Sequence, residues 1–219
     1  MTKPILVAPS LLAADPMSYE KEAKSVEDAG ADLHHVDVMD GHFVPNLTFG
    51  LPFIRALKKT SKIPLDVHIM ISNPDQMAIE YVHAGADTLV FHVEAAVHPH
   101  RLIQMIKDSG KRAGIAINPG TSISTISSLI PFIDVVNVMT VNPGFGGQNF
   151  IQEVLIKIEE LRNLSERRTT PFDIQVDGGI NLETVAAAKN AGANILVAGT
   201  AVFGHADRKS AIELLKGKQ

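Results

Sequence analysis

One stretch of the chain, Ala29-Gly30-Ala31-Asp32-Leu33-His34-His35-Val36-Asp37-Val38-Met39, combines the features of a helix end and of a buried strand. The glycine suits the left-handed residue that ends a helix, and the Val-containing run Leu33–Met39 is typical of a strand. Similar strings occur at Ala84-Gly85-Ala86-Asp87 and Ala191-Gly192-Ala193-Asn194, and the three are separated by 55 and 107 positions. Those separations are close to two and four units of roughly 27 residues. Such strings are also common loops, so the repeat supports a fold of helix-and-strand units without deciding it alone.

Short apolar runs rich in Val and Ile recur along the whole chain. Near-continuous apolar character over so few residues is typical of parallel strands covered on both faces. The stretches between them, including Met17–Ala29, Asp75–Ala84 and Gln152–Arg167, carry helical periodicity. We predict an α/β fold, a single (β/α)8 TIM barrel domain over residues 1–219, with an open doubly wound sheet as the alternative. The expected strands are Ile5–Pro9, Leu33–Met39, Pro64–Met70, Thr88–Val93, Ala113–Ile117, Ile133–Met139, Phe172–Val176 and Ile195–Ala198.

The composition excludes several classes of protein. The 219 residues include no cysteine, so the chain has no disulfide, no thiolate metal site and no thiol nucleophile. A net charge of −4 without basic clusters argues against nucleic acid or an anionic membrane as a partner. No apolar run approaches the roughly 20 residues of a membrane-spanning helix, and Met1–Pro9 lacks the layout of a signal peptide. We therefore expect a soluble, cytoplasmic protein.

Polar and methionine residues stand two apart at the ends of several expected strands. Alternation along a strand directs both members of such a pair to the same face. In a barrel that face is the interior, and the active site lies at the C-terminal ends of the strands. The candidates in chain order are Ser10, His35, Asp37, Met39, Asp66, His68, Met70, His92, Glu94, Asn118, Asn137, Met139, Gln175, Asp177 and Gly199.

Four of these candidates form a nitrogen and oxygen ligand set for a divalent metal ion: His35, Asp37, His68 and Asp177. Without a thiolate, the set suits Zn²⁺, Fe²⁺, Mn²⁺ or Co²⁺. His34 is adjacent to His35, so we expect it to face the helix layer or solvent. A lone strand histidine is usually a structural residue. Buried carboxylates without partners cost several kcal/mol, however, so this group calls for a metal ion or a charged substrate.

Glycines follow the last three expected strands. Most glycines only form tight turns, but here they would let backbone N–H groups approach an anion closely. Barrels usually bind phosphate after strands seven and eight. No GxxxxGK[ST] motif is present, and no GxGxxG follows the first strand, so we expect the phosphate of a small substrate rather than of ATP or NAD. The segments are Asn142–Gln148, Asp177-Gly178-Gly179 and Gly199-Thr200.

Three methionines, Met39, Met70 and Met139, fall at strand ends on the side assigned to the pocket. A methionine in a strand is ordinarily core filler. Together these three are predicted to form an apolar wall that excludes water from a reacting centre.

Several of these segments resemble the motifs of one known family. The segment His35-Val36-Asp37-Val38-Met39-Asp40-Gly41-His42-Phe43-Val44-Pro45-Asn46 is similar to the strand-two signature of D-ribulose-5-phosphate 3-epimerases. The resemblance runs from about residue 4 to residue 204 and keeps the motif order. Its other motifs are Ala8-Pro9-Ser10-Leu11-Leu12, Asp66-Val67-His68-Ile69-Met70, the loop 144–150 and Val176-Asp177-Gly178-Gly179-Ile180.

The resemblance implies a (β/α)8 barrel of the pentose phosphate pathway and the Calvin cycle that uses one divalent metal and no organic cofactor. It implies His35, Asp37, His68 and Asp177 as metal ligands, and a homo-oligomer, either a dimer or a hexamer. Thr200 stands where serine is more usual, and it keeps the hydroxyl. The implied substrate contacts are Ser10, His68, Gly144, Phe145, Gly146, Gly147, Asp177, Gly178, Gly179, Gly199 and Thr200.

The implied reaction inverts carbon 3 of a 2-keto sugar phosphate. Removing the C–H beside the carbonyl and replacing it on the other face requires two acid/base groups. Asp37 would take the proton of D-ribulose 5-phosphate, and Asp177 would donate one to the opposite face to give D-xylulose 5-phosphate. The metal would stabilise the enediolate.

Three alternatives remain at this stage. An allulose-6-phosphate 3-epimerase would share the barrel and the ligands, although Gly146-Gly147 and Gly178-Gly179-Ile180 favour the ribulose-phosphate branch. A phosphate-binding lyase or decarboxylase would usually place a lysine at a strand end, whereas Lys62 and Lys111 precede their strands. A non-catalytic binding protein would not need two opposed aspartates.

Overall fold

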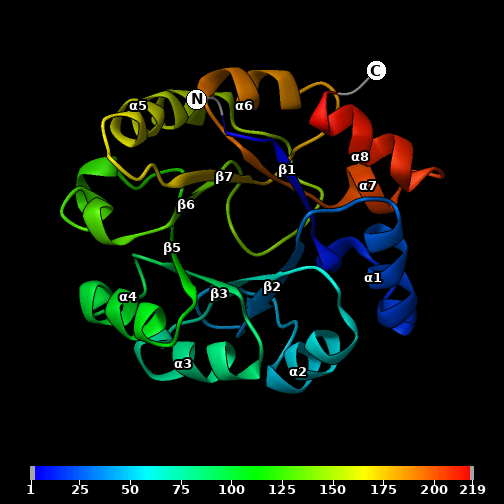
Figure 1. The fold of residues 1–219 in the computed structure, drawn as a ribbon, viewed down its shortest axis with the longest axis horizontal. Helices are drawn as coiled ribbons and strands as arrows, with labels where there is room; N and C mark the ends of the chain where they lie inside the picture. The colour runs from blue at the N-terminus through cyan, green and yellow to red at the C-terminus, as the bar shows by residue number, and fades with distance from the viewer. Residues whose placement is uncertain (1–2, 218–219) are drawn as a thin grey trace.

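Eight parallel strands form the centre of the molecule in a computed structural model that describes residues 3–217. The strands follow one another around a barrel, and helices surround them (Figure 1). Almost every strand residue is buried, as the near-continuous apolar runs predict. The strands are β1 Leu6–Pro9, β2 His34–Met39, β3 Leu65–Met70, β4 Thr88–His92, β5 Arg112–Ile117, β6 Val135–Met139, β7 Asp173–Asp177 and β8 Ile195–Ala198.

The barrel is nearly closed where β1 meets β2. The hydrogen-bonded order is β1-β8-β7-β6-β5-β4-β3-β2, so the first strand pairs with the last. Between β1 and β2, Ser10 and His35 form one parallel bridge, and the Asp32 N–H donates to the Val7 carbonyl over 3.0 Å. A doubly wound sheet reverses its strand order at a switch point and leaves two edges. That alternative is therefore wrong, and the TIM barrel is confirmed.

The helices occupy most of the connections between strands. The expected helix Asp75–Ala84 is found, and Met17–Ala29 and Gln152–Arg167 each begin with a short 3₁₀ turn. The α-helices are α1 Tyr19–Asp28, α2 Leu51–Thr60, α3 Pro74–Ala84, α4 Pro99–Asp108, α5 Leu155–Glu166, α6 Val185–Ala191, α7 Thr200–Phe203 and α8 Arg208–Lys216. The 3₁₀ turns are η1 Leu11–Ala13, η2 Pro16–Ser18, η3 Ile123–Ile126, η4 Ile130–Phe132 and η5 Gln152–Val154.

The connection from β5 to β6 departs from the expected pattern, because η3 and η4 stand where an α-helix was predicted. Serine and β-branched residues crowd this segment, and Ser122 caps the first turn by accepting from the Ser124 N–H. Such residues have low helix propensity, and Pro131 then interrupts the chain. The barrel remains intact because β5 and β6 still pair along their length.

An Asp or Asn side chain joins each even-numbered strand to the odd-numbered strand before it. The residue accepts a hydrogen bond from that strand's first or second N–H, at 2.8–3.0 Å, and returns its own N–H to the carbonyl of the same residue. Three of these residues end the repeated Ala-Gly-Ala-Asp/Asn strings, so the repeat has a physical cause. The pairs are Asp32 with Val7, Asp87 with Leu65, Asp134 with Ala113 and Asn194 with Ile174.

Removing one of these side chains destabilises the barrel. In Asp134→Ala the buried Ala113 N–H loses its acceptor, and we expect the free energy of unfolding to fall by about 1–3 kcal/mol. Asp134→Asn keeps an oxygen in place, as Asn194 does naturally, and gives up an exposed ion pair with Lys107 that contributes about 1 kcal/mol at most. Urea unfolding measures both. Equal losses in the two variants would contradict this role.

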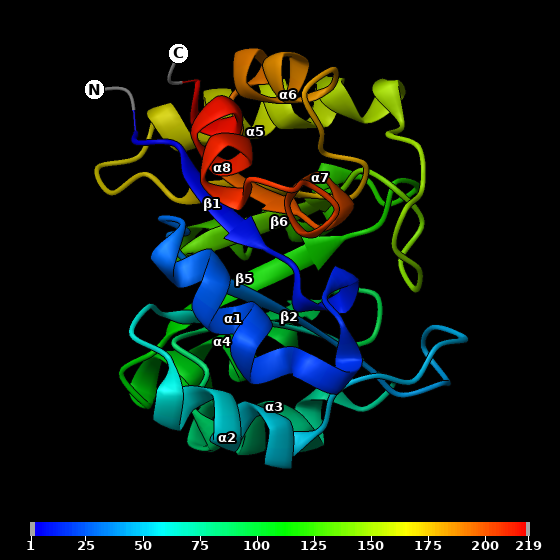
Figure 2. The same cartoon turned by 90° about the vertical axis from the view of Figure 1, so that its right-hand side faces the viewer.

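The C-terminal ends of the strands lie on one side of the barrel, with the loops after β2 and β6 extending beyond them (Figure 2). That side carries the predicted site residues. Among residues 3–217, no helix is both long and apolar enough to cross a bilayer.

Candidate metal centre and active site

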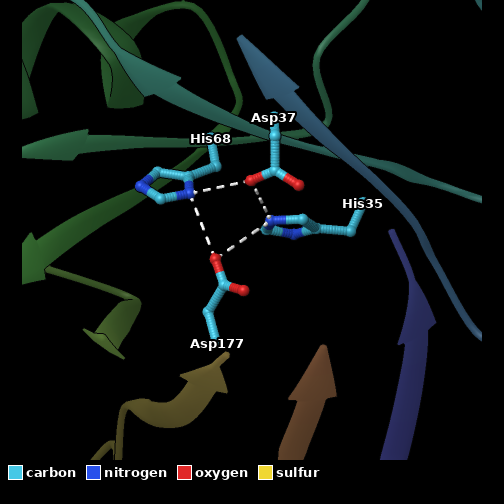
Figure 3. A group of neighbouring side chains, drawn as sticks. All are labelled: His35, Asp37, His68 and Asp177. Atoms are coloured by element: carbon cyan, nitrogen blue, oxygen red, sulfur yellow. Dashed lines mark hydrogen bonds and ion pairs between the residues drawn. The ribbon is translucent and has the colours of Figure 1, made fainter. Parts of the chain in front are cut away.

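Four side chains from three strands meet inside the barrel. His35 and Asp37 come from β2, His68 from β3 and Asp177 from the end of β7, and all four are buried. Asp37 and Asp177 approach from opposite sides, with the two imidazoles between them (Figure 3). One atom of each residue lies within 4.8 Å of the corresponding atoms of the other three. The structure therefore brings together the set predicted from the sequence.

The spacing of these atoms fits a metal ion. Asp37 Oδ1 lies 3.1 Å from His35 Nε2 and 3.2 Å from His68 Nδ1, and Asp177 Oδ2 lies 3.4 and 3.3 Å from the same nitrogens. Ligands held tetrahedrally at 2.0–2.1 Å from a metal stand about 3.3–3.4 Å apart. Asp177 Oδ2 is buried without a hydrogen bond of normal geometry, which leaves a lone pair available.

The charges of the group also fit a divalent cation. Burial and the charge of Asp37 raise the pKa of Asp177, but His35 and His68 outweigh both and hold it below its usual value. Burial likewise raises the pKa of Asp37, and the same histidines lower it well below its usual range. Burial lowers the pKa values of His35 and His68, yet the aspartates raise them overall. Two buried carboxylates held in their charged form suit a divalent cation placed among the four side chains.

Asp66 and Gln175 fix the orientation of the His35 ring on the side away from the four-residue group. Its Nδ1 lies 2.7 Å from Asp66 Oδ2, and the Gln175 amide donates to the same oxygen over 2.9 Å. A carboxylate only accepts, so His35 carries a proton on Nδ1 and turns Nε2 toward the group. Asp66 and Gln175 lie on the barrel face predicted for them, although the sequence assigned them no role.

A longer chain of contacts stands behind His68. Its Nε2 lies 2.9 Å from His92 Nε2, and His92 Nδ1 lies 3.1 Å from Glu94 Oε2. Burial lowers the pKa of His92 to about 4, so this imidazole is neutral at pH 7. Burial raises the pKa of Glu94, but His92 and the Asn118 N–H bring it to about 2, so the carboxylate is charged.

A cavity of about 590 Å³ opens above the two aspartates. Ser10 lies at its wall, and its hydroxyl donates to Asp37 Oδ2 over 2.6 Å. His35 and His68 are fully buried behind the aspartates and do not line it. The predicted contact of His68 with substrate therefore stays a prediction. The three predicted methionines, Met39, Met70 and Met139, line the cavity. The exposed ring of Phe145 lines it as well.

The predicted glycine segments line the other side of the cavity, together with Thr200. Gly178 has φ +119° and a Cβ there would overlap Val141, while a Cβ on Gly179 would lie 2.6 Å from the Phe150 nitrogen. Both positions therefore require glycine. Within residues 3–217 the backbone N–H groups that donate no hydrogen bond at this wall include those of Gly178, Gly179, Gly199 and Thr200.

The two adjacent histidines face opposite ways, as alternation requires. His34 points outward, where its Nε2 lies 2.9 Å from Glu27 Oε1 on α1. The cavity wall also includes Asn46 and Asn149, which the sequence reasoning missed as site residues, and Gln148 at the end of a predicted glycine segment. They lie in loops, where no strand alternation indicates direction. Gln148 folds its own loop by donating to the carbonyls of Asn142 and Phe145 over 2.7 and 2.9 Å.

The lyase alternative requires a lysine at a strand end, and Lys157 comes close to such a position. It reaches from α5 to the carbonyls of Asn118, Pro119 and Thr121 at 3.2, 2.5 and 2.6 Å, beyond the end of β5. It does not line the cavity. No lysine among residues 3–217 lines the cavity, so the structure offers none for a lysine-dependent cleavage there.

Solved structures with low sequence identity share the fold. A mutant tryptophan synthase alpha-subunit from Pyrococcus furiosus superposes with a TM-score of 0.71 at 15% identity, covering 99% of this chain and 100% of that one. A 3-hexulose-6-phosphate synthase gives a TM-score of 0.68 at 20% identity, covering 98% and 99%. These likenesses concern the barrel alone.

Sequence relatives are much closer. The model of the ribulose-phosphate 3-epimerase family matches residues 6–203. A ribulose-phosphate 3-epimerase of Bacillus subtilis (strain 168) is 49% identical over 216 residues, covering 98% of this chain and 100% of that protein. A chloroplastic ribulose-5-phosphate-3-epimerase of Arabidopsis thaliana is 44% identical over 218 residues, covering 98% and 77%. The chain therefore belongs to the ribulose-phosphate 3-epimerase family, and it is an isomerase.

Proposed function

We propose that this enzyme interconverts D-ribulose 5-phosphate and D-xylulose 5-phosphate by inverting carbon 3 through a 2,3-enediolate, as a step of the pentose phosphate pathway. The observation that carries the proposal is the pair Asp37 and Asp177, which face each other across a metal-binding group at the base of the cavity. Inversion beside a carbonyl needs one proton acceptor and one donor on opposite faces of the same carbon. The names of the relatives support the same substrate.

One divalent ion, Zn²⁺, Fe²⁺, Mn²⁺ or Co²⁺, would be held by His35, Asp37, His68 and Asp177. When bound, it would supply positive charge beside the C2 and C3 oxygens and so stabilise the enediolate. We further propose that the enzyme is a cytoplasmic homo-oligomer, either a dimer or a hexamer, and that it works without an organic cofactor, nucleic acid or membrane.

The protein's own residues move the protons. Asp37 takes the C3 proton of D-ribulose 5-phosphate, and Asp177, which must enter this step protonated, delivers its proton to the other face; proton exchange with solvent then resets both carboxyl groups. The Ser10 hydroxyl, by donating to Asp37 Oδ2, keeps that carboxylate in one rotamer. In the reverse direction the two aspartates exchange roles. Met39, Met70 and Met139 cover the reacting carbon with apolar surface, which keeps water from protonating the enediolate.

The phosphate group would bind at the wall of the cavity formed by the glycine segments. The N–H groups of Gly178, Gly179, Gly199 and Thr200 are unpaired within the described residues, and phosphate oxygens accept such donors. The loop with Gly144, Phe145, Gly146 and Gly147 belongs to the same lining and would cover the bound substrate.

Gly178→Ala should weaken phosphate binding. The added methyl group overlaps Val141, and φ +119° is unfavourable for alanine, so the N–H groups of this turn move. We expect KM for the sugar phosphate, and Ki for inorganic phosphate, to rise at least about tenfold, which corresponds to about 1.4 kcal/mol. Gly120→Ala, which does not line the cavity, is the matched control, because its Cβ meets no atom within 4 Å and its φ is not left-handed. Equal KM values for the two variants would contradict the assignment.

A comparison of substrates tests the proposed function. The metal-loaded protein is assayed with D-ribulose 5-phosphate and with allulose 6-phosphate, and both products are identified by NMR. Conversion of the first with the higher kcat/KM supports the proposal. Preference for the second makes the enzyme an allulose-6-phosphate 3-epimerase, and loss of carbon from either sugar makes it a lyase or decarboxylase.

A further inference from the structure

His68 is the one proposed metal ligand backed by a second imidazole. The chain of contacts runs from His68 Nε2 to His92 Nε2 over 2.9 Å and from His92 Nδ1 to Glu94 Oε2 over 3.1 Å. The His68 and His92 rings are stacked with centroids 5.0 Å apart, and both side chains are fully buried. Neither His92 nor Glu94 is required by the proton transfers proposed above.

The direction of these hydrogen bonds follows from the chemistry of the last group. A charged carboxylate only accepts, so His92 must carry its proton on Nδ1 and donate to Glu94. Its Nε2 then has a lone pair and accepts from His68. His68 must therefore carry a proton on Nε2, and its Nδ1 is the nitrogen free to bind a cation between Asp37 and Asp177.

Glu94 cannot turn a proton toward His92, because its second carboxylate oxygen already accepts two hydrogen bonds that hold the group in place. Glu94 Oε1 accepts from the Asn118 backbone N–H over 2.7 Å and from the Thr121 hydroxyl. Lys157 holds the loop that carries these donors, because its Nζ donates to the carbonyls of Pro119 and Thr121 over 2.5 and 2.6 Å. The carboxylate is thus held in one orientation from a loop after β5.

We infer that Glu94, acting through His92, is a positioning residue that selects the His68 tautomer with Nδ1 free for metal. The inference rests on the proposed metal site. We call the contacts His68–His92–Glu94 the relay. His35 does not depend on the relay, because its Nδ1 has its own partner in Asp66. Outer hydrogen bonds of this kind typically change metal affinity 10- to 100-fold when they are lost.

Glu94→Gln is the informative substitution, because it preserves shape and changes one acceptor into a donor. The Asn118 N–H is fixed in the backbone, so the amide oxygen stays there and the NH₂ group faces His92 Nδ1. A metal-loaded protein then has two donors facing each other. The metal-free protein relieves the conflict by moving the His68 proton to Nδ1, which is the metal-binding atom. We expect Zn²⁺ and Co²⁺ affinity to fall at least about tenfold.

The experiment measures metal affinity by competition with a chromophoric chelator, and the Co²⁺ absorption spectrum reports the ligand geometry. Thr121→Val removes one donor to Glu94 but keeps the carboxylate, so it should bind metal as the wild type does. In a His92→Phe background there is no imidazole to transmit the tautomer, and adding Glu94→Gln should change affinity less than about threefold. Thermal unfolding of each metal-free variant establishes that it is folded.

Nitrogen-15 NMR of the wild-type imidazoles gives a second readout that needs no variant. The relay requires the His92 proton on Nδ1 and a proton on His68 Nε2, and a His92 proton on Nε2 would overturn it. A Glu94→Gln protein with wild-type metal affinity, or an equal effect in the His92→Phe background, would also overturn it. A wild type that binds no metal but shows the required tautomers would instead contradict the proposed metal site, so the two failures are distinguishable.

Discussion

Asp177→Asn should yield an enzyme that exchanges the C3 proton of D-ribulose 5-phosphate with solvent but no longer inverts C3. Asp37 remains able to take that proton and to return a solvent deuteron to the same face. The donor on the opposite face is missing, so we expect formation of D-xylulose 5-phosphate to fall by about 10²–10⁴-fold. Proton NMR in D₂O separates the two events, since exchange removes the C3 signal of unconverted substrate.

Asp37→Asn should show the corresponding behaviour with the two substrates exchanged. It should exchange the C3 proton of D-xylulose 5-phosphate and leave that of D-ribulose 5-phosphate in place. Both aspartates belong to the candidate metal-binding group, so the metal content of each variant must be measured beside its activity. Asp108→Asn, on the exposed end of α4, is the control and should behave as the wild type. Substantial inversion by either site variant would remove that aspartate from the mechanism.

Removal of the metal should abolish turnover, and restoring a divalent ion should recover it. The same ion should stabilise the folded protein, because it binds the assembled group and not the unfolded chain. At 100 times its dissociation constant a ligand contributes about 2.7 kcal/mol, which for a protein of this size raises Tm by about 5–10 °C.

Two variants, His68→Ala and His42→Ala, show whether the metal that raises Tm binds at this group or at another histidine. His68 is fully buried in the candidate metal-binding group, whereas His42 is exposed in the loop after β2. The increase in Tm on adding metal should disappear in His68→Ala and persist in His42→Ala. An unchanged increase in both variants would place the bound metal elsewhere.

The strands were predictable because both sides of a barrel strand are buried. Leu6–Pro9 and Ile195–Ala198 are continuous apolar runs, and the structure places the strand ends within two residues of those expected. The inward direction of His35, Asp37 and His68 followed from alternation by two. The β5–β6 connection was not predicted, since its serine-rich turns carry the same apolar spacing as a short helix.

The relay behind His68 illustrates what a sequence does not carry. His92 and Glu94 were expected at the rim, but the contact between His92 and His68 depends on the lateral register of β3 and β4. The Glu94 contact to Asn118 depends likewise on where the chain turns after β5. Spacing along one strand gives the face of a side chain, whereas its neighbour across strands is set by the register of the closed sheet.

Proton NMR of D-ribulose 5-phosphate with the wild-type protein in D₂O, before and after metal removal, tests the central claim most directly. We predict that D-xylulose 5-phosphate appears with deuterium at C3, that both inversion and exchange stop when the metal is removed, and that a divalent ion restores them. Product formed without deuterium from solvent would contradict proton transfer by two aspartates. Exchange that continues unchanged without metal would contradict the role assigned to the metal-binding group.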